Sequence, residues 1–157
     1  MPETHPIILF DGTCGLCDRT VRLVSRLDRK GRFRFAPLQS EAAAFLFQRH
    51  HVPESIDSIV LVHQGSDGGR ARVQSDAAIG VARLLGFPWS LAVVFLAIPR
   101  PIRDAAYRFI ARHRYRVFGR VDACGLPTEA QRALVIETRE EAERISGKPG
   151  EKDGDGR

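Results

Sequence analysis

The chain opens with a run of four apolar residues, Ile7–Phe10, which ends at the turn signal Asp11-Gly12-Thr13. Beyond the turn, apolar residues recur every three or four positions up to Leu27, the spacing of one face of a helix. This pattern predicts a short buried strand followed by a helix from about residue 14 to residue 28. Two cysteines three positions apart, Cys14 and Cys17, stand where that helix begins.

Further strands and helices alternate along the first half of the chain. Residues 33–36 and 58–62 predict strands, and a hairpin turn at 65–69 leads into a returning strand at 70–74. Ser40 and Ser75 are the expected N-caps of two helices, the second of which covers residues 76–85 and ends at Gly86. The order predicts an α/β fold with a small mixed four-stranded sheet covered on both faces, a thioredoxin-like βαβαββα core with additional C-terminal helices.

The second half of the chain begins with its most apolar segment, residues 87–98, which prolines bracket on both sides. The uncharged stretch is shorter than the roughly 18 residues of a membrane-spanning helix, so we expect a short buried helix with Pro88 in its first turn. Residues 102–118 predict a basic amphipathic helix. Its apolar face comprises Ile102, Ala105, Ala106, Phe109 and Ile110, and its arginines (100, 103, 108, 112, 114, 116 and 120) are expected to be exposed.

Two interpretations of residues 87–120 remain open at this stage. The arginines can simply be a solvated face, or the segment can contact an anionic membrane surface or a membrane partner. After it, residues 128–145 predict a charged helix that carries Leu134 and Ile136, and residues 146–157 predict a disordered tail. The expected organisation is therefore one domain over 1–127, a C-terminal helix over 128–145 and a tail over 146–157.

Composition narrows the class of protein. The chain has 157 residues, a formal net charge of +5 and three cysteines. The balance is only mildly basic, and we expect no nucleic-acid partner. An odd and low number of cysteines argues against a disulfide-stapled secreted domain, and no signal peptide is visible before Ile7. We therefore expect a cytoplasmic protein, in which a CxxC pair is more often catalytic or metal-binding than structural.

The cysteine pair predicts thiol–disulfide exchange with a protein or small-molecule partner. At the start of a helix, unpaired backbone N–H groups and the helix dipole favour a thiolate over a thiol, so Cys14 is the expected attacking sulfur and should be accessible. Cys17 lies a turn further in and should be the less exposed, resolving thiol. Asp11 has two interpretations, as a turn residue bonded to nearby N–H groups or as a carboxylate that moves a proton to or from Cys17.

Several stretches, from Asp11, Cys14 and Cys17 onward, resemble the DCC family of predicted thiol–disulfide oxidoreductases, named for a DxxCxxC motif. Similar too are residues 37–40, 75–78, 86–89, 98–104 and 114–120, in the family's order and ending at Cys124. The resemblance covers about residues 7–127, and it implies a thioredoxin-like fold and an exchange activity that uses no cofactor. Asp57 stands where thioredoxins have a cis-proline facing the sulfurs, and Thr13 stands where they have a tryptophan, so the substrate groove should differ.

Two other functions remain as alternatives. The fold could serve as a non-catalytic adaptor that binds a membrane or protein partner through the basic helix. Less favoured is a zinc or iron–sulfur site on the cysteines, because a structural zinc needs four ligands and the chain has no second CxxC. Cys124 is most simply a buried apolar residue, but it could resolve a mixed disulfide or form an intermolecular bridge.

Overall fold

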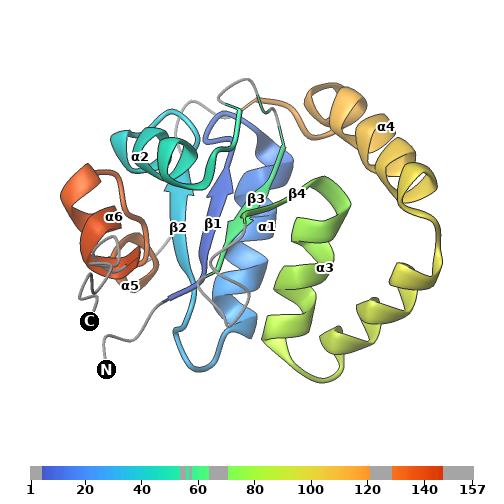
Figure 1. The fold of residues 1–157 in the computed structure, drawn as a ribbon, viewed down its shortest axis with the longest axis horizontal. Coiled ribbons are helices and arrows are strands. Elements are labelled where there is room, and N and C mark those ends of the chain that lie inside the picture. The colour runs from blue at the N-terminus through green and yellow to red at the C-terminus, as the bar shows by residue number, and fades with distance from the viewer. Residues whose placement is uncertain (1–4, 54–55, 57, 64–70, 121–128, 147–157) are drawn as a thin grey trace, which may run out of the picture.

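The computed structural model of the protein describes residues 5–53, 56, 58–63, 71–120 and 129–146. Its elements follow one another as β1 (Ile7–Phe10), α1 (Gly15–Leu27), β2 (Arg34–Pro37), α2 (Glu41–His50), β3 (Val60–Val62), β4 (Ala71–Val73), α3 (Gln74–Leu85), the 3-10 helix η1 (Trp89–Ala97), α4 (Arg100–Phe118), α5 (Glu129–Arg132) and α6 (Arg139–Ser146) (Figure 1). The first seven elements reproduce the predicted order. The hairpin turn at 65–69 and Cys124 lie outside the described residues.

The four strands form one mixed sheet in the order β2-β1-β3-β4. Strand β1 pairs with β2 in parallel and with β3 in antiparallel orientation, and β3 pairs with β4 antiparallel. The parallel pair is joined by helix α1, as a parallel connection requires. This is the thioredoxin-like arrangement that the sequence predicted, and it places the cysteines just beyond the C-terminal end of β1, a strand with neighbours on both sides.

The alternation of side chains along the strands divides the core into two layers. On one face Ile7 and Leu9 pack with α2 and α6, and on the other Ile8 and Phe10 pack with α1 and α3. All four residues of β1 are at least 99% buried, which explains why this strand reads as a continuous apolar run. Both faces of the sheet are therefore covered before the chain reaches η1.

Of the two serines predicted to be helix N-caps, one is confirmed and the other is wrong. Ser40 caps α2 as predicted, since its hydroxyl accepts a hydrogen bond from the Ala43 N–H. The prediction for Ser75 is wrong, because α3 begins at Gln74 with Val73 as its N-cap. The Ser75 hydroxyl instead hydrogen-bonds Asp104 of α4, so this serine joins two helices. Gly86 ends α3 as expected, with φ at +84°.

The prediction of a buried helix over residues 87–98 is also wrong. Residues Trp89–Ala97 form the 3-10 helix η1, and none of them is buried. The physical reason is that α1 and α3 already cover the nearer face of the sheet, so η1 packs on the outside of α3 (Figure 1). Within the described part of the chain, no helix combines the length and apolar character needed to cross a bilayer.

Residues 128–145 were expected to form one helix, and here too the structure differs. Two short helices, α5 and α6, flank an extended piece in which Val135 makes a parallel bridge to Phe35 of β2. Backbone hydrogen bonds connect Phe35 N to Leu134 O (2.9 Å) and Ile136 N to Phe35 O (2.8 Å). Ile136 is buried in the same core layer as α2, so this segment completes the edge of the sheet beside β2. The expected tail falls outside the described residues, apart from Ser146, which is the last residue of α6.

Candidate active site

The two predicted redox residues lie together where β1 passes into α1. Cys14 is the N-cap of the helix in an extended conformation, and its carbonyl accepts the first helical hydrogen bond from Asp18 N (3.0 Å). The Cys14 N–H donates to the Asp11 carbonyl (3.2 Å), which closes the turn between strand and helix. Both Cys14 and Cys17 are free thiols. The N–H groups of the first helical turn point towards this end, where the helix dipole favours a negative charge.

The expected order of exposure is reversed. Cys14 has 0% of its surface exposed, whereas Cys17, predicted to be the more buried, is partly exposed. The reason is a backbone segment that sequence spacing could not reveal. The Gly15 N–H donates to the Gly119 carbonyl (3.2 Å), and Cys14 forms an antiparallel bridge with Arg120. The end of α4 therefore covers the start of α1.

The contact between these two segments is close. A Cβ atom added to Gly15 would lie 2.4 Å from the Phe118 carbonyl oxygen, so this position leaves no room for a side chain. The guanidinium of Arg19 lies over the Phe118 ring at 5.6 Å, a cation–π contact that holds the same segment. We refer to Phe118–Arg120 as the cover segment.

The Cys17 thiol is strongly disfavoured as an anion. Its burial and the neighbouring Cys14 sulfur raise the pKa of Cys17 to about 12, although a hydrogen bond from the Asp11 backbone and the charge of Arg114 oppose the increase. Interaction between the two thiols is thus part of the reason that Cys17 stays protonated.

Asp11 is the centre of a hydrogen-bond network. Its Oδ1 atom accepts from the Thr13 N–H (2.9 Å), the Thr13 hydroxyl (2.8 Å) and the Gln39 amide (3.2 Å). Its Oδ2 atom accepts from Arg114 Nη2 (3.2 Å) and from the Tyr115 hydroxyl. Burial alone would raise the pKa of Asp11, but the hydrogen bonds from Tyr115, Thr13 and Gln39 outweigh it and leave the pKa below its ordinary value of 3.8.

Arg114 and Tyr115 are site residues that sequence reasoning missed. Arg114 was expected on an exposed face, but it is only 3% exposed, and its charge acts on both Asp11 and Cys17. The misleading signal was the large number of arginines in this helix. A better signal is the spacing Tyr107, Ala111 and Arg114, which places the three residues on one face of α4, and all three line the same pocket.

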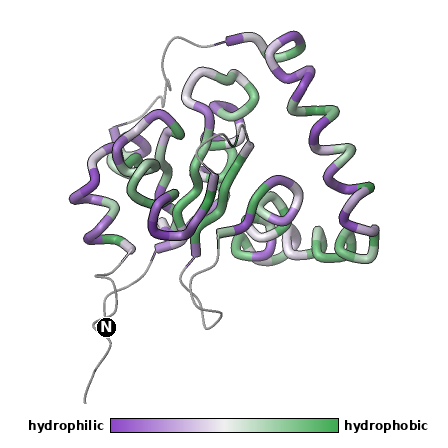
Figure 2. Tube along the Cα trace, turned by 45° about the horizontal axis from the view of Figure 1, so that its top comes forward, coloured by the Kyte–Doolittle hydropathy of each residue, from purple (hydrophilic) through white to green (hydrophobic). Residues whose placement is uncertain are grey.

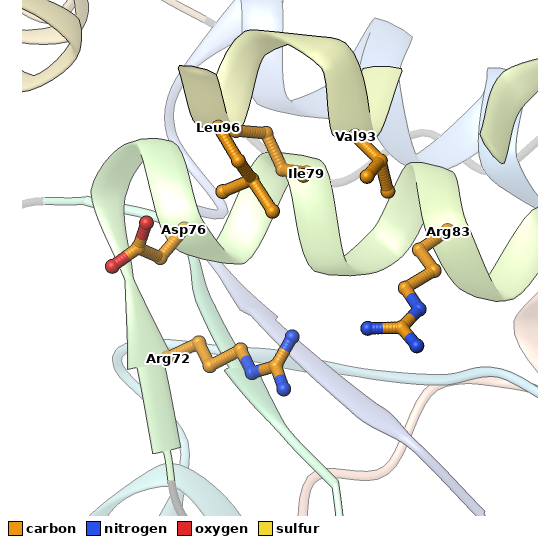
Figure 3. A pocket seen from close by; sticks show the side chains of 6 residues that line it. All are labelled: Arg72, Asp76, Ile79, Arg83, Val93 and Leu96. Carbon is orange, nitrogen blue, oxygen red and sulfur yellow. The ribbon is translucent and has the colours of Figure 1, made fainter. Parts of the chain in front are cut away.

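That pocket has a volume of about 160 Å³ and opens on Cys17 rather than on Cys14. Apart from Thr20, Tyr107, Arg114 and Cys17 itself, its walls are apolar: Phe10, Leu16, Val21, Ile59, Ala78, Ile110 and Ala111. A second pocket of about 300 Å³ lies between η1 and α3, away from either thiol, with Arg72 and Arg83 at its rim (Figure 3). Among the described residues, no three His, Cys, Asp or Glu side chains gather as a metal site would require.

The fold and the dithiol together define a thioredoxin-like protein with a CxxC pair at the start of its first helix. Comparison with known families makes this class more specific. The sequence matches the model of the DCC1-like thiol-disulfide oxidoreductase family over residues 8–120. The chain belongs to this family, which supports a redox function in general, and the matched range includes every residue of the site described above.

Two curated proteins are similar to the chain in sequence. The chain is 40% identical over 123 residues to the uncharacterized protein YuxK of Bacillus subtilis, covering 78% of this chain and 87% of the relative. It is 37% identical over 126 residues to the DCC family protein At1g52590 of Arabidopsis thaliana, whose name describes it as chloroplastic, covering 79% of this chain and 71% of that protein. No solved structure matches the chain.

Proposed function

We propose that the protein is a thiol–disulfide oxidoreductase whose redox couple is Cys14 and Cys17. The observation that carries the proposal is the pairing of an N-cap sulfur with a partner thiol that interacts with it and has a pKa of about 12. The pair lies at the point of a thioredoxin-like fold where a helix begins, and the family's description supports the same chemistry.

The reaction proceeds in two exchange steps. The Cys14 thiolate attacks one sulfur of a substrate disulfide, forms a mixed disulfide and releases the first substrate thiolate. Cys17 then attacks the Cys14 sulfur, so that the Cys14–Cys17 disulfide forms, the mixed disulfide breaks, and the second substrate thiol leaves with the proton that Cys17 gives up. The substrate disulfide is reduced by two electrons and the enzyme dithiol is oxidised. The same steps in reverse oxidise a substrate dithiol.

Asp11 serves in this proposal as a positioning residue rather than as the proton acceptor. A carboxylate with five hydrogen-bond donors and a lowered pKa is a poor base for a thiol with a pKa of about 12. Its role is to fix the turn before Cys14 and to hold Arg114 in the site. The Arg114 guanidinium then favours the Cys17 thiolate during the second step.

The cover segment sets a condition on substrate access. Because Cys14 has no exposed surface, a substrate disulfide reaches its sulfur only when Phe118–Arg120 moves from the start of α1. The contacts to be released include one backbone hydrogen bond and the stacking of Arg19 on Phe118. We expect this movement to limit the reaction with bulky protein disulfides more than with small ones.

The test uses single cysteine variants in a Cys124→Ser background. With Cys17→Ser, attack by Cys14 stops after the first step, so a glutathione disulfide probe should leave one glutathione on Cys14, visible by intact mass. The wild-type dithiol should instead release both thiols and gain an internal disulfide. Cys14→Ser is the matched control, and it should react far more slowly at neutral pH. Equal labelling of both variants, or a wild-type protein that forms no internal disulfide, would contradict the proposal.

A further inference from the structure

Helix α4 presents its apolar face to solvent and its polar face to the protein. Ile102, Phe109 and Val117 are spaced about two helical turns apart along α4, so they lie on one side of the helix. Their exposed fractions are 61%, 66% and 68%. The sequence led us to expect all seven arginines of this segment to be exposed, but Arg114 is buried and Arg103 is half-buried against the protein. A helix of this kind normally turns its apolar side to the core.

The polar face of α4 explains the orientation. Arg103 forms an ion pair with Asp76 (2.8 Å), and Asp104 hydrogen-bonds Ser75, so the start of the helix is fixed to α3. In its middle, the Tyr107 hydroxyl accepts the Ile59 N–H (3.0 Å), and at its end Arg114 pairs with Asp11. These specific polar contacts hold the helix with its apolar stripe outward.

The neighbouring segment η1 has a similar character. Figure 3 shows Val93 and Leu96 of η1 directed towards α3, close to Ile79. Most of its other residues are exposed, and Val94 is 71% exposed. Figure 2 shows η1 as an almost continuous hydrophobic stretch that leads into α4, where hydrophobic and hydrophilic positions alternate. Six large apolar residues between positions 87 and 117 are each at least 60% exposed, and we call them the apolar ridge: Phe87, Leu91, Val94, Ile102, Phe109 and Val117.

The positive charge of the protein is concentrated in the same segment. Residues 86–120 contain seven arginines and one aspartate, a formal charge of +6, whereas the whole chain carries +5. All other residues together therefore amount to −1. Arg108, Arg112 and Arg116 are exposed and lie along one flank of the apolar stripe of α4.

We propose that the apolar ridge is the surface by which the protein binds an anionic phospholipid bilayer. The ridge would enter the interfacial layer while the flanking arginines contact lipid phosphates, the arrangement by which interfacial amphipathic segments bind membranes. Only Ile98 and Pro99 separate η1 from α4, so the two parts of the ridge are next to each other in the chain. Trp89, which is partly exposed next to the ridge, is a residue type that favours the membrane interface.

The concentration of charge favours a bilayer over an apolar protein groove. Arginine is common at protein–protein interfaces, but there each guanidinium pairs with a partner group such as a carboxylate in a fixed geometry. An anionic bilayer instead attracts every exposed arginine near its surface and accepts apolar side chains beside them. Docking here would also place the cover segment, and with it the entrance to Cys14, close to the membrane.

Binding of the reduced full-length protein to lipid vesicles tests the proposal. Vesicles of equal parts phosphatidylglycerol and phosphatidylcholine should co-sediment the protein at low salt, and pure phosphatidylcholine vesicles should bind it at least about tenfold more weakly. Trp89 is the chain's only tryptophan, so its emission reports on the ridge directly. On binding, its emission should shift to the blue and should be quenched by brominated lipids.

Two triple variants separate the apolar and charged contributions. Ile102→Gln/Phe109→Gln/Val117→Gln and Arg108→Gln/Arg112→Gln/Arg116→Gln should each weaken binding by at least about tenfold. Leu23→Gln and Arg26→Gln/Arg29→Gln/Lys30→Gln change exposed residues of the same kinds elsewhere, and both should bind like wild type. The substituted side chains are exposed, so the variants should fold.

Several results would overturn the proposal. The first is a failure to bind anionic vesicles at low salt. The second is binding that the apolar variant leaves intact or that leaves Trp89 emission unchanged, which would show electrostatic adsorption alone. The third is self-association, seen by light scattering, that removes the exposed ridge and is lost in the apolar variant, which would make this face an interface between copies.

Discussion

Arg114 Nη2 lies 3.2 Å from Asp11 Oδ2, and the two residues, 103 positions apart in the chain, are both buried. This pair connects the end of α4 to the turn that precedes the cysteines. The pair joins two segments, which are separate motifs in the sequence, into one site. It also places the positive charge of Arg114 close enough to Cys17 to favour the Cys17 thiolate.

Replacing Arg114 should destabilise the protein severely. In Arg114→Met the Asp11 carboxylate stays buried without its cation, and breaking a buried pair from one side costs about 3–5 kcal/mol. Urea denaturation should show this loss in the free energy of unfolding. Arg112→Met, an exposed arginine of the same helix, is the matched control and should change stability by about 0.5 kcal/mol or less. Similar losses in the two variants would contradict a special role for the Asp11 pair.

Tyr115→Phe should alter the pH dependence of stability at acid pH. The Tyr115 hydrogen bond is foremost among those that lower the pKa of Asp11 below 3.8. A carboxyl whose pKa is lowered on folding stabilises the protein above its unfolded pKa, and this stability is lost as the pH falls through the folded pKa. The variant should therefore be less stable than wild type by about 1–3 kcal/mol at pH 7, and the difference should shrink as the pH falls below about 4.

Denaturation with urea at a series of pH values measures that difference. Tyr107→Phe is the control, because its hydroxyl bonds the Ile59 backbone and not Asp11. Its stability deficit should stay constant over the same pH range. If the stability deficit of Tyr115→Phe were equally independent of pH, the Tyr115 hydroxyl would not be what lowers the pKa of Asp11.

Removing one thiol should change the titration of the other. The Cys14 sulfur is one cause of the Cys17 pKa of about 12, so Cys14→Ser should lower the Cys17 pKa, while burial keeps it above 9.0. The ultraviolet absorbance of thiolate against pH, in a Cys124→Ser background, follows the change. Cys17→Ser should show no transition near pH 12, and an unchanged Cys17 titration in Cys14→Ser would mean that the sulfurs do not interact.

The raised pKa of Cys17 should also make the stability of the protein depend on pH in the alkaline range. The pKa of Cys17 in the folded protein lies above the ordinary value of 9.0. Its protonated form therefore contributes stability that is fully present below pH 9.0 and is lost as the pH rises towards about 12. Cys17→Ser should remove this dependence, which pH-dependent urea denaturation of reduced protein would show.

Gly15→Ala should displace the cover segment. Alanine for glycine usually stabilises a helix, but here the added Cβ would lie 2.4 Å from the Phe118 carbonyl oxygen. We expect a loss of about 1–3 kcal/mol in stability, together with faster alkylation of Cys14 because its cover has moved. At Gly12 a Cβ would meet its nearest atom, Gln39 Oε1, at 3.4 Å, so Gly12→Ala is the control and should not accelerate alkylation. Slower alkylation in Gly15→Ala would refute the role given to the segment.

Ile136→Ala should show that the C-terminal segment belongs to the core. Ile136 is 3% exposed and packs in the layer between the sheet and α2, so truncation should cost about 2–5 kcal/mol in the free energy of unfolding. Leu23→Ala removes an exposed side chain of similar size and should cost about 0.5 kcal/mol or less. An equally small effect at Ile136 would mean that the segment is not part of the cooperative unit.

The sequence by itself determined the core and the location of the thiols. Strand β1, helix α1 and the cap at Ser40 depend on contacts within a few residues, so apolar spacing and capping signals were sufficient to predict them. The order of strands and helices then fixed the thioredoxin-like sheet, because few pairings satisfy the rules of connection. The DxxCxxC motif placed Cys14 and Cys17 at a helix start for the same local reason.

Tertiary structure alone decided what surrounds those sulfurs. The burial of Cys14 under the cover segment and the pair between Asp11 and Arg114 join segments about one hundred residues apart. The outward apolar face of α4 also depends on contacts with α3, which lies 27 to 29 residues earlier in the chain. Hydrophobic periodicity identifies two faces of a helix but not which face has partners. In α4 the polar face bonds Asp11, Ser75 and Asp76, and these specific contacts, with the sheet already covered by other helices, turned the apolar face outward.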